Sequence, residues 1–141
     1  MMRLKTLKVF RSILIIQSLY TLITGVWPLI HIDSFIAATG PKDDIWLVKT
    51  VGAMLIPVSV ALAAFIWIKA SKVPAILLGG LTAIVFAIID FHFALADVIS
   101  NVYMIDGLLQ LFFAAGWIWI ARRELIEHRK SLEQKTTVFI R

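Results

Sequence analysis

Apolar residues fill four long runs of this chain, and shorter polar segments separate them. The runs cover about residues 9–30, 45–68, 73–96 and 102–121. A membrane-spanning helix needs about 20 predominantly apolar residues, and each run reaches that length. The pattern therefore predicts an all-α protein, a four-helix transmembrane bundle that forms a single integral membrane domain over residues 1–141, with a polar tail at 122–141.

The connections between the runs carry signals of their own. Ile32, Phe35 and Ile36 recur at helical spacing, which predicts a short interfacial helix in the longest connection. Pro57 lies in the middle of the second run and predicts a kink there, because proline removes a backbone donor. Pro74 suits the first turn of the third helix. We also expect the fourth helix to continue into the tail, with its charged residues facing water.

Composition supports a membrane location and excludes several chemistries. Hydrophobic residues make up 60% of the chain and charged residues 16%, whereas a soluble domain has about half and about a quarter. The chain has no cysteine, which excludes disulfides, thiol catalysis and thiolate-held clusters. The net charge of +5 does not indicate nucleic-acid binding, because the basic residues form no stripe interleaved with exposed aromatic residues.

Basic residues gather on one side of the predicted bundle. The N-terminal segment, the connection between the second and third runs, and the tail hold twelve lysines and arginines, whereas the other side holds Lys42 and Lys49. By the positive-inside rule, this count predicts a protein of the cytoplasmic membrane with both termini in the cytoplasm. The basic N-terminus resembles the start of a signal peptide, but no small-residue cleavage site follows it. We therefore expect an uncleaved first span.

Polar residues interrupt the third and fourth runs, and they include the candidate site. Asp90 comes sixteen residues after Pro74, which places it roughly 24 Å along the helix, within a hydrocarbon core of about 30 Å. Asp106, one turn into the fourth span, should reach a similar depth. A carboxylate at the helix centre costs about 2.5–3.5 kcal/mol, so both residues need partners or water. Lys49 is the cation at comparable height, and we expect it to pair with Asp90 or Asp106 inside the bundle.

Helical spacing decides which of these polar residues share a face. Asp90 and Asp97 share one, as do Asp106 and Gln110, but His92 is rotated from Asp90 by about 200°. This rotation weakens a metal-site interpretation, and we predict no metal or other cofactor. Three interpretations of the carboxylates stay open: an ion-pair network that fixes helix register, a proton, ion or ligand site, and interfacial solvation. The predicted polar pocket comprises Lys49, Asp90, Asp106, His92, Asp97 and Gln110.

Other side chains indicate how the helices pack and where the bilayer ends. A polar side of the first span is expected to face the bundle interior, and it consists of Gln17, Ser18, Tyr20, Thr21 and Thr24. Small residues in the third span recur at spacings that allow another helix to approach closely, namely Ala75, Gly79, Gly80, Ala83 and Ala87. Aromatic belts at the two interfaces are predicted for Trp27, Trp46, Tyr103, Trp117 and Trp119.

The chain contains no soluble-enzyme motif: no phosphate-binding glycine loop, nucleophile elbow or His-Glu-x-x-His. We therefore expect a non-enzymatic multi-pass membrane protein, either an accessory or interaction subunit or a small proton-coupled transport component that titrates Asp90 or Asp106. Its expected partners are the lipid bilayer and a second copy or another membrane protein, not nucleic acid. One alternative is a membrane-embedded enzyme or redox partner that uses His31, His92 and the aspartates on a lipid-soluble substrate such as a quinone. Another is lipid or headgroup binding at the outer pocket.

Four short segments resemble those of small bacterial four-span membrane proteins. They are residues 25–28 (Gly-Val-Trp-Pro), 39–42 (Thr-Gly-Pro-Lys), 46–52 (Trp-Leu-Val-Lys-Thr-Val-Gly) and 100–106 (Ser-Asn-Val-Tyr-Met-Ile-Asp). In size and span count the chain is also similar to DoxX-like proteins. The resemblance covers most of the chain and implies a four-helix membrane fold, but it assigns no active residues.

Overall fold

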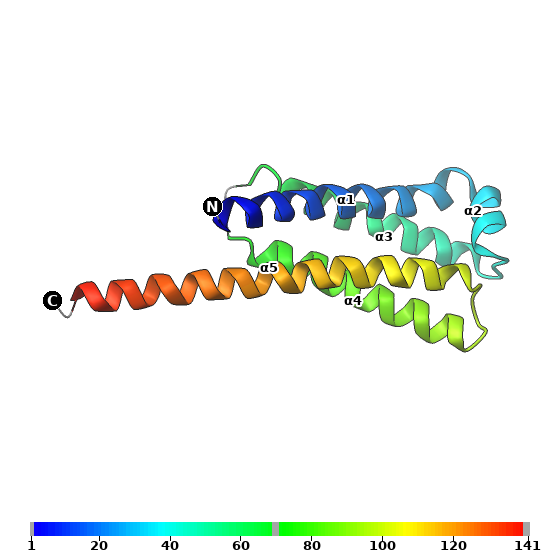
Figure 1. Cartoon of the computed structure of the whole chain (residues 1–141). Coiled ribbons are helices and arrows are strands. Elements are labelled where there is room, and N and C mark those ends of the chain that lie inside the picture. The colour runs from blue at the N-terminus through cyan, green and yellow to red at the C-terminus, as the bar shows by residue number, and fades with distance from the viewer. Residues whose placement is uncertain (1, 69–70, 140–141) are drawn as a thin grey trace.

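The computed structural model describes residues 2–68 and 71–139, which form five helices and no strand. The helices are α1 (Met2–Ile30), α2 (Ile32–Thr39), α3 (Ile45–Ala64), α4 (Val73–Leu95) and α5 (Val102–Phe139). The predicted all-α fold is confirmed, because α1, α3, α4 and α5 contain segments long and apolar enough to cross a membrane. The two ends of the chain lie at the same end of the bundle, opposite α2 (Figure 1).

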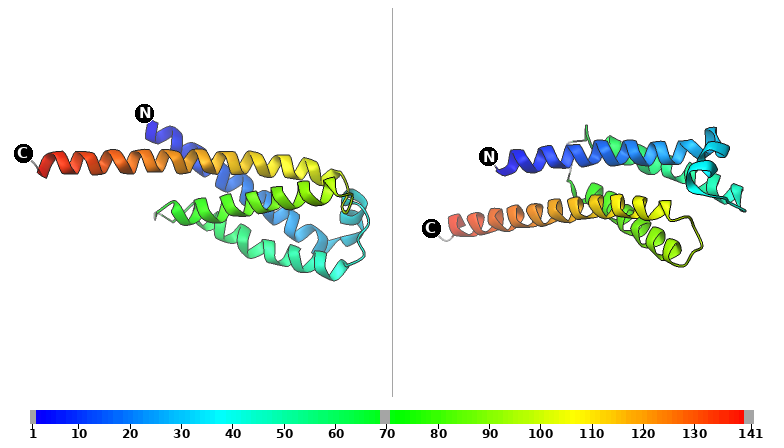
Figure 2. Two further views of the ribbon diagram at one scale, coloured as in Figure 1. Left: turned by 90° about the horizontal axis from the view of Figure 1, so that it is seen from below. Right: turned by 45° about the vertical axis from the view of Figure 1, so that its right-hand side comes forward.

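The four long helices form two pairs. α1 packs along α3, and α4 packs along α5 (Figure 2). The pairs meet mainly through α1 and α5, whereas α3 and α4 touch only sparsely. The bundle is therefore two tight helix pairs joined along one side.

Glycines bring the helices of each pair close together. A Cβ atom at Gly52 of α3 would lie 2.6 Å from the carbonyl oxygen of Gly25 in α1, so the two backbones are in direct contact. In the other pair, a Cβ atom at Gly79 would lie 2.5 Å from the indole ring of Trp117. Small residues at a helix interface allow this approach. Gly79 and the other small residues predicted to mediate packing in α4 are buried.

The helices begin and end close to the predicted bounds, except at two ends. α1 begins at Met2, seven residues before the predicted start of the first span at residue 9. The short helix predicted in the longest connection is confirmed as α2, and its place at the membrane interface stays a prediction. α5 extends into the tail as expected. α3 ends at Ala64, four residues before the predicted end, because the amides of Phe65, Ile66 and Trp67 bond three residues back and tighten the last turn. The kink at Pro57 stays a prediction. The first two residues of the connection at 69–74 lie outside the described residues.

We call the half of the bundle that holds the chain ends the terminal half. Its core contains Phe10, Leu14, Leu62, Trp117 and Ile120, all buried. Trp117 is 1% exposed and packs edge-on against Phe10. The predicted place of Trp117 in an interfacial belt is therefore wrong. Its indole N–H donates to a buried acceptor, so the ring can be buried without leaving this polar group unsatisfied.

A buried hydrogen-bond chain crosses this core. The Trp117 indole donates to Gln17 Oε1 at 2.5 Å, and Gln17 Nε2 donates to the Gly79 carbonyl oxygen at 2.9 Å. The chain thus links α1, α4 and α5. The predicted inward orientation of Gln17, Ser18 and Thr21 is confirmed by their burial.

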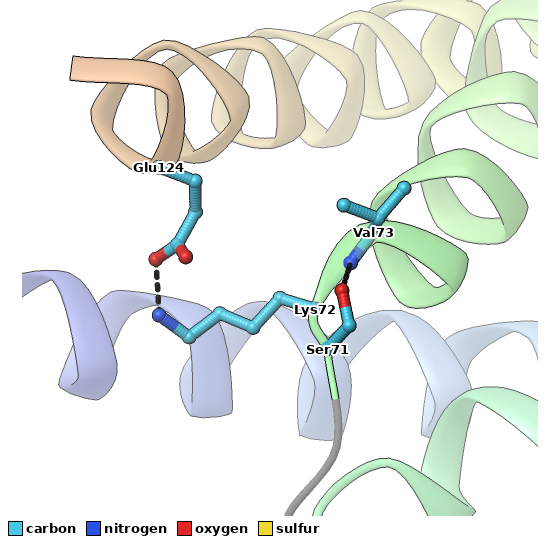
Figure 3. Close-up of polar contacts among 4 residues, drawn as sticks. All are labelled: Ser71, Lys72, Val73 and Glu124. Carbon is cyan, nitrogen blue, oxygen red and sulfur yellow. Dashed lines mark hydrogen bonds and ion pairs between the residues drawn. The ribbon is translucent and has the colours of Figure 1, made fainter. Parts of the chain in front are cut away.

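An ion pair fastens the end of the terminal half. Lys72, just before α4, pairs with Glu124 of α5 (Figure 3). The ammonium of Lys72 also lies 5.7 Å from the centre of the Phe10 ring. The ion pair therefore ties α4 to α5 where the spans meet the tail.

Candidate functional site

The other half of the bundle, next to α2, encloses a cavity of about 330 Å³. We call this half the cavity half. The cavity lies between the two helix pairs, and its wall includes residues from all five helices. Side chains from α3 and α4 contribute most of its apolar surface, among them Val51, Leu55 and Phe86. The cavity therefore lies where the two pairs are least closely packed.

Asp90 of α4 lines this cavity. The residue is 3% exposed, and its Oδ2 atom has no hydrogen-bond partner among the described residues. A buried polar atom usually has a partner, because leaving one unsatisfied costs about 1–3 kcal/mol. An unpaired carboxyl oxygen in a cavity wall is thus available to a ligand or a proton.

Asp106 of α5 lines the same cavity and has protein partners. Its Oδ1 atom accepts hydrogen bonds from the hydroxyl of Tyr20 and, at 3.3 Å, from Nε2 of Gln110. Tyr20 comes from α1, so this contact joins the two helix pairs. Asp90 and Asp106 line one cavity between the helix pairs, as expected of residues that face the bundle interior. Gln110 contacts Asp106 but is not among the residues that line the cavity, and the depth of the two carboxyl groups in the membrane stays a prediction.

Aromatic rings surround the two carboxyl groups. Phe35, Phe86, Phe93 and Tyr103 line the cavity together with Asp90 and Asp106. Among the described residues that line it, none is a lysine, arginine or histidine. The lining therefore combines acidic groups and aromatic side chains, and none of its described residues is basic.

Lys49 does not supply that cation, and its predicted ion pair is wrong. The side chain is exposed and does not line the cavity. Across residues 2–68 and 71–139, no ion pair joins it to Asp90 or Asp106. Val48, the residue before it on α3, and Gly52, three residues after it, face the cavity instead, so the rotation of α3 turns Lys49 outward.

Lys42 is the basic residue that approaches this end of the bundle. Its ammonium donates to the carbonyl oxygens of Thr39 and Gly40 at 3.1 and 3.3 Å, and it lies 5.0 Å from the centre of the Tyr103 ring. Burial lowers the pKa of Lys42. Because α2 carbonyls hold this ammonium, Lys42 fastens α2 over the start of α5.

His92 and Asp97 do not belong to the cavity, contrary to prediction. His92 is exposed and packs edge-on against Phe93, as its rotation from Asp90 requires. Asp97 is exposed and lies beyond the end of α4, with a φ of 55°. The amides of Asp97 and Val98 bond to the carbonyls of Ala94 and Phe93, a Schellman-type stop. Asp97 therefore ends a helix and does not extend the acidic face of α4.

The histidine and metal hypotheses receive no geometric support. His31 is exposed and caps α2, where its Nδ1 accepts a hydrogen bond from the amide of Ser34 at 3.2 Å. Within the described part of the chain, no three His, Asp or Glu side chains gather closely enough to hold a metal ion. Neither His31 nor His92 lines the cavity with Asp90 and Asp106, as the alternative enzyme or redox hypothesis would require.

A second hollow lies on the outer surface, between α3 and α4. This groove has a volume of about 410 Å³ and is lined by apolar residues such as Met54, Val58 and Val85. Val51, Leu55 and Phe86 line both the groove and the cavity. The groove therefore adjoins the cavity on the side that would face lipid.

Sequence reasoning missed the aromatic lining and the role of Tyr20. Phe86 and Phe93 lie in an apolar run where every residue is a candidate for lipid contact, so the sequence pattern does not show that they face the cavity. Tyr20 did carry a signal, because it belongs to the polar side of the first span. That side was expected to face inward. Its pairing with Asp106 could have been predicted if α5 had been known to lie beside α1.

Comparisons of the chain with family models, with curated proteins and with solved structures gave no match.

Proposed function

We propose that this protein is a non-enzymatic multi-pass protein of the cytoplasmic membrane that works as a small proton-coupled transport component. The observation that carries the proposal is the carboxyl group of Asp90, buried in a cavity wall within a membrane-type bundle and with one oxygen unpaired. Ionisable residues within membrane spans mark ion and substrate pathways. Asp90 is the group that would bind and release the coupled proton.

The surroundings of Asp90 support a titrating role. Asp106 and Tyr103 of α5 and Tyr20 of α1 are the titratable groups that interact electrostatically with it. Asp106 already accepts two hydrogen bonds, whereas Asp90 Oδ2 has no described partner. A proton on Asp90 would remove the repulsion between the two carboxylates, and a cation in the cavity would do the same. Protonation and ligand binding are therefore alternatives at one site.

The arrangement of the helices supports movement around this site. The α1–α3 and α4–α5 pairs are each closely packed, and contact between α3 and α4 is sparse. Many transporters work by rocking one bundle against another around a central site. Here the cavity lies between the two pairs, so a rotation about the α1–α5 contact would open or close it.

Orientation and assembly complete the proposal. Twelve of the fourteen basic residues belong to the side that carries the chain ends, which supports cytoplasmic termini and a cavity in the outer half of the membrane. We expect the transporting unit to be a homo-oligomer, because four spans enclose little volume. A partner membrane protein is the alternative arrangement.

Proton flux in proteoliposomes tests the proposal. Purified full-length protein is reconstituted with an entrapped pH-sensitive dye, a pH gradient is imposed, and organic cations, anions and neutral compounds are added in turn. One of these classes should accelerate collapse of the gradient with wild-type protein. The Asp90→Asn variant should lose this flux, because an amide cannot exchange a proton, and Asp106→Asn should reduce it.

Asp97→Asn is the matched control, since it removes an exposed aspartate outside the cavity. It should leave the flux unchanged. Flux that is equal in wild type, Asp90→Asn and Asp106→Asn would eliminate the proposed role of both residues. Flux that no compound class stimulates in wild type would eliminate coupled transport itself.

A further inference from the structure

We infer that the cavity binds a hydrophobic organic cation, with its positive centre beside Asp90 and its apolar part directed along the α3–α4 groove. This inference deepens the proposed function, because it names the substrate class of the same site. The binding inference does not depend on transport, since the protein could bind such a cation without carrying it across the membrane.

Charge is the first argument for a cation. Asp90 and Asp106 are two acidic groups in the wall of one cavity, and the described lining residues include no basic side chain. A cation would be attracted to both carboxylates and would supply the counter-charge that the lining lacks, whereas an added anion would be repelled by them. The Asp90 oxygen also has no described donor, so a ligand that supplies positive charge or an N–H group would satisfy it.

The aromatic lining is the second argument. Phe35, Phe86, Phe93 and Tyr103 come from α2, α4 and α5 and surround the same space. Aromatic faces attract cations, and aromatic cages are a known solution for binding quaternary ammonium groups. A neutral apolar ligand would also pack against these rings, but it would leave the carboxyl oxygen unpaired.

The groove is the third argument, and it indicates how the cation arrives. Val51, Leu55 and Phe86 separate the cavity from the groove and line both. The groove wall beyond them is apolar except for Thr82, and Met54 and Val85 are 66% and 51% exposed. A cation with an apolar body partitions into the bilayer and would reach the groove from the lipid. At the end of the bundle, Phe35 lines the cavity and Lys42 lies over the Tyr103 ring, and a basic residue there is unfavourable for a cation arriving from water.

Calorimetry with one apolar body in two charge states tests the inference. Purified full-length protein in detergent is titrated with benzyltrimethylammonium and with phenylmethanesulfonate, at a pH below and a pH above neutrality. Wild type should bind the cation and not the sulfonate. Because the quaternary ammonium does not titrate, tighter binding at the higher pH would report deprotonation of the carboxyl groups. Asp90→Asn should weaken binding by about tenfold or more, and Asp97→Asn should bind as wild type does.

The outcomes separate this inference from the proposed transport. Cation binding that requires Asp90, together with an absence of proton flux, retains the site and overturns transport. Proton flux without cation binding overturns the site and retains transport. Preference for the sulfonate, or equal binding by wild type and Asp90→Asn, overturns the inference. Binding of the neutral quinone decylubiquinone in place of the cation overturns it in favour of a redox role.

A bulky residue in the groove tests the route. Val85 lines the groove and not the cavity, so Val85→Trp narrows the groove, and Ile84→Trp places the same side chain on the neighbouring exposed position. In proteoliposomes, Val85→Trp should slow association of the cation severalfold and leave its affinity unchanged, whereas Ile84→Trp should do neither. Equal association rates for wild type and Val85→Trp would overturn access through the groove.

Discussion

The two halves of the bundle treat buried polar groups in opposite ways. In the terminal half, Gln17 is 1% exposed, donates to the Gly79 carbonyl and accepts from the Trp117 indole. In the cavity half, Asp90 is 3% exposed and has an oxygen with no described partner. A polar group without a partner inside a membrane protein is costly, and such groups mark functional positions. The comparison thus indicates cohesion in the terminal half, and it is the basis for the ligand binding that we propose for the cavity half.

The contrast also explains where the two helix pairs are less tightly connected. Gln17 and Trp117 connect α1, α4 and α5, so the two pairs are held together in the terminal half. In the cavity half, the hydrogen bond from Tyr20 of α1 to Asp106 of α5 links the two pairs. Movement of the pairs is therefore expected to pivot about the terminal half and to change the cavity most.

The largest predicted effect comes from removing the centre of the terminal half. Trp117→Ala should lower the free energy of unfolding by about 3–5 kcal/mol, since it empties a closely packed core position and leaves Gln17 Oε1 without its donor. Unfolding by SDS titration in mixed micelles measures this change. Trp119→Ala is the matched control, because that ring is 37% exposed, and it should cost much less. Equal losses would show that Trp117 is not the core residue described above.

The packing within a helix pair gives the second prediction. Gly52→Ala should lower the free energy of unfolding by about 2–3 kcal/mol, because overpacking a close contact forces the backbones apart, and the new Cβ would lie 2.6 Å from the Gly25 carbonyl oxygen. Gly80→Ala is the control, since its nearest contact would be 3.4 Å, to Trp117 Cβ. The same SDS titration compares them. A stable Gly52→Ala protein would contradict the direct backbone contact of α1 and α3.

How much of this arrangement the sequence predicts depends on the kind of signal involved. Run length predicted four membrane-type helices, and helical spacing predicted the short helix in the longest connection and the helical tail. They also placed Asp90 and Asp106 at one depth, because depth follows from residue number at a fixed rise along a helix. Rotation about a helix axis is different. In a span that is apolar on all sides, the hydrophobic pattern barely distinguishes the lipid face from the bundle face.

Lys49 and Trp117 are the residues on which this ambiguity produced errors. Lys49 has the expected height but points away from the cavity, because α3 presents Val48 and Gly52 there. Trp117 resembles a belt residue by type and position, and its burial depends on an acceptor one hundred residues away, Gln17. Neither orientation can be read from local spacing, since both depend on which helices become neighbours.

Replacing the buried polar residue of each half with leucine should change the free energy of unfolding in opposite directions. Asp90→Leu should raise the free energy of unfolding by about 1–3 kcal/mol, because it removes an unsatisfied buried carboxyl group. Gln17→Leu should lower it by a similar amount, because it leaves the buried Trp117 indole N–H without an acceptor and removes the second hydrogen bond to the Gly79 carbonyl. SDS titration of both variants beside wild type measures the signs. A loss of stability in Asp90→Leu would indicate that Asp90 serves cohesion, as Gln17 does, and would remove the distinction between the halves.

The smallest predicted effect lies at the end of the terminal half, where Lys72 pairs with Glu124. Both side chains are partly exposed, at 19% and 31%, so Lys72→Met should lower the free energy of unfolding by only about 0.5–1 kcal/mol, and less at high salt. Lys49→Met is the control and should change nothing, since Lys49 is exposed and forms no ion pair with the described residues. Combining Lys72→Met with Glu124→Gln should cost no more than the larger single change, because both substitutions break the same contact. If the two losses add instead, the lysine stabilises this end through its contact with the Phe10 ring and not through the ion pair, and the terminal half is held by its core alone.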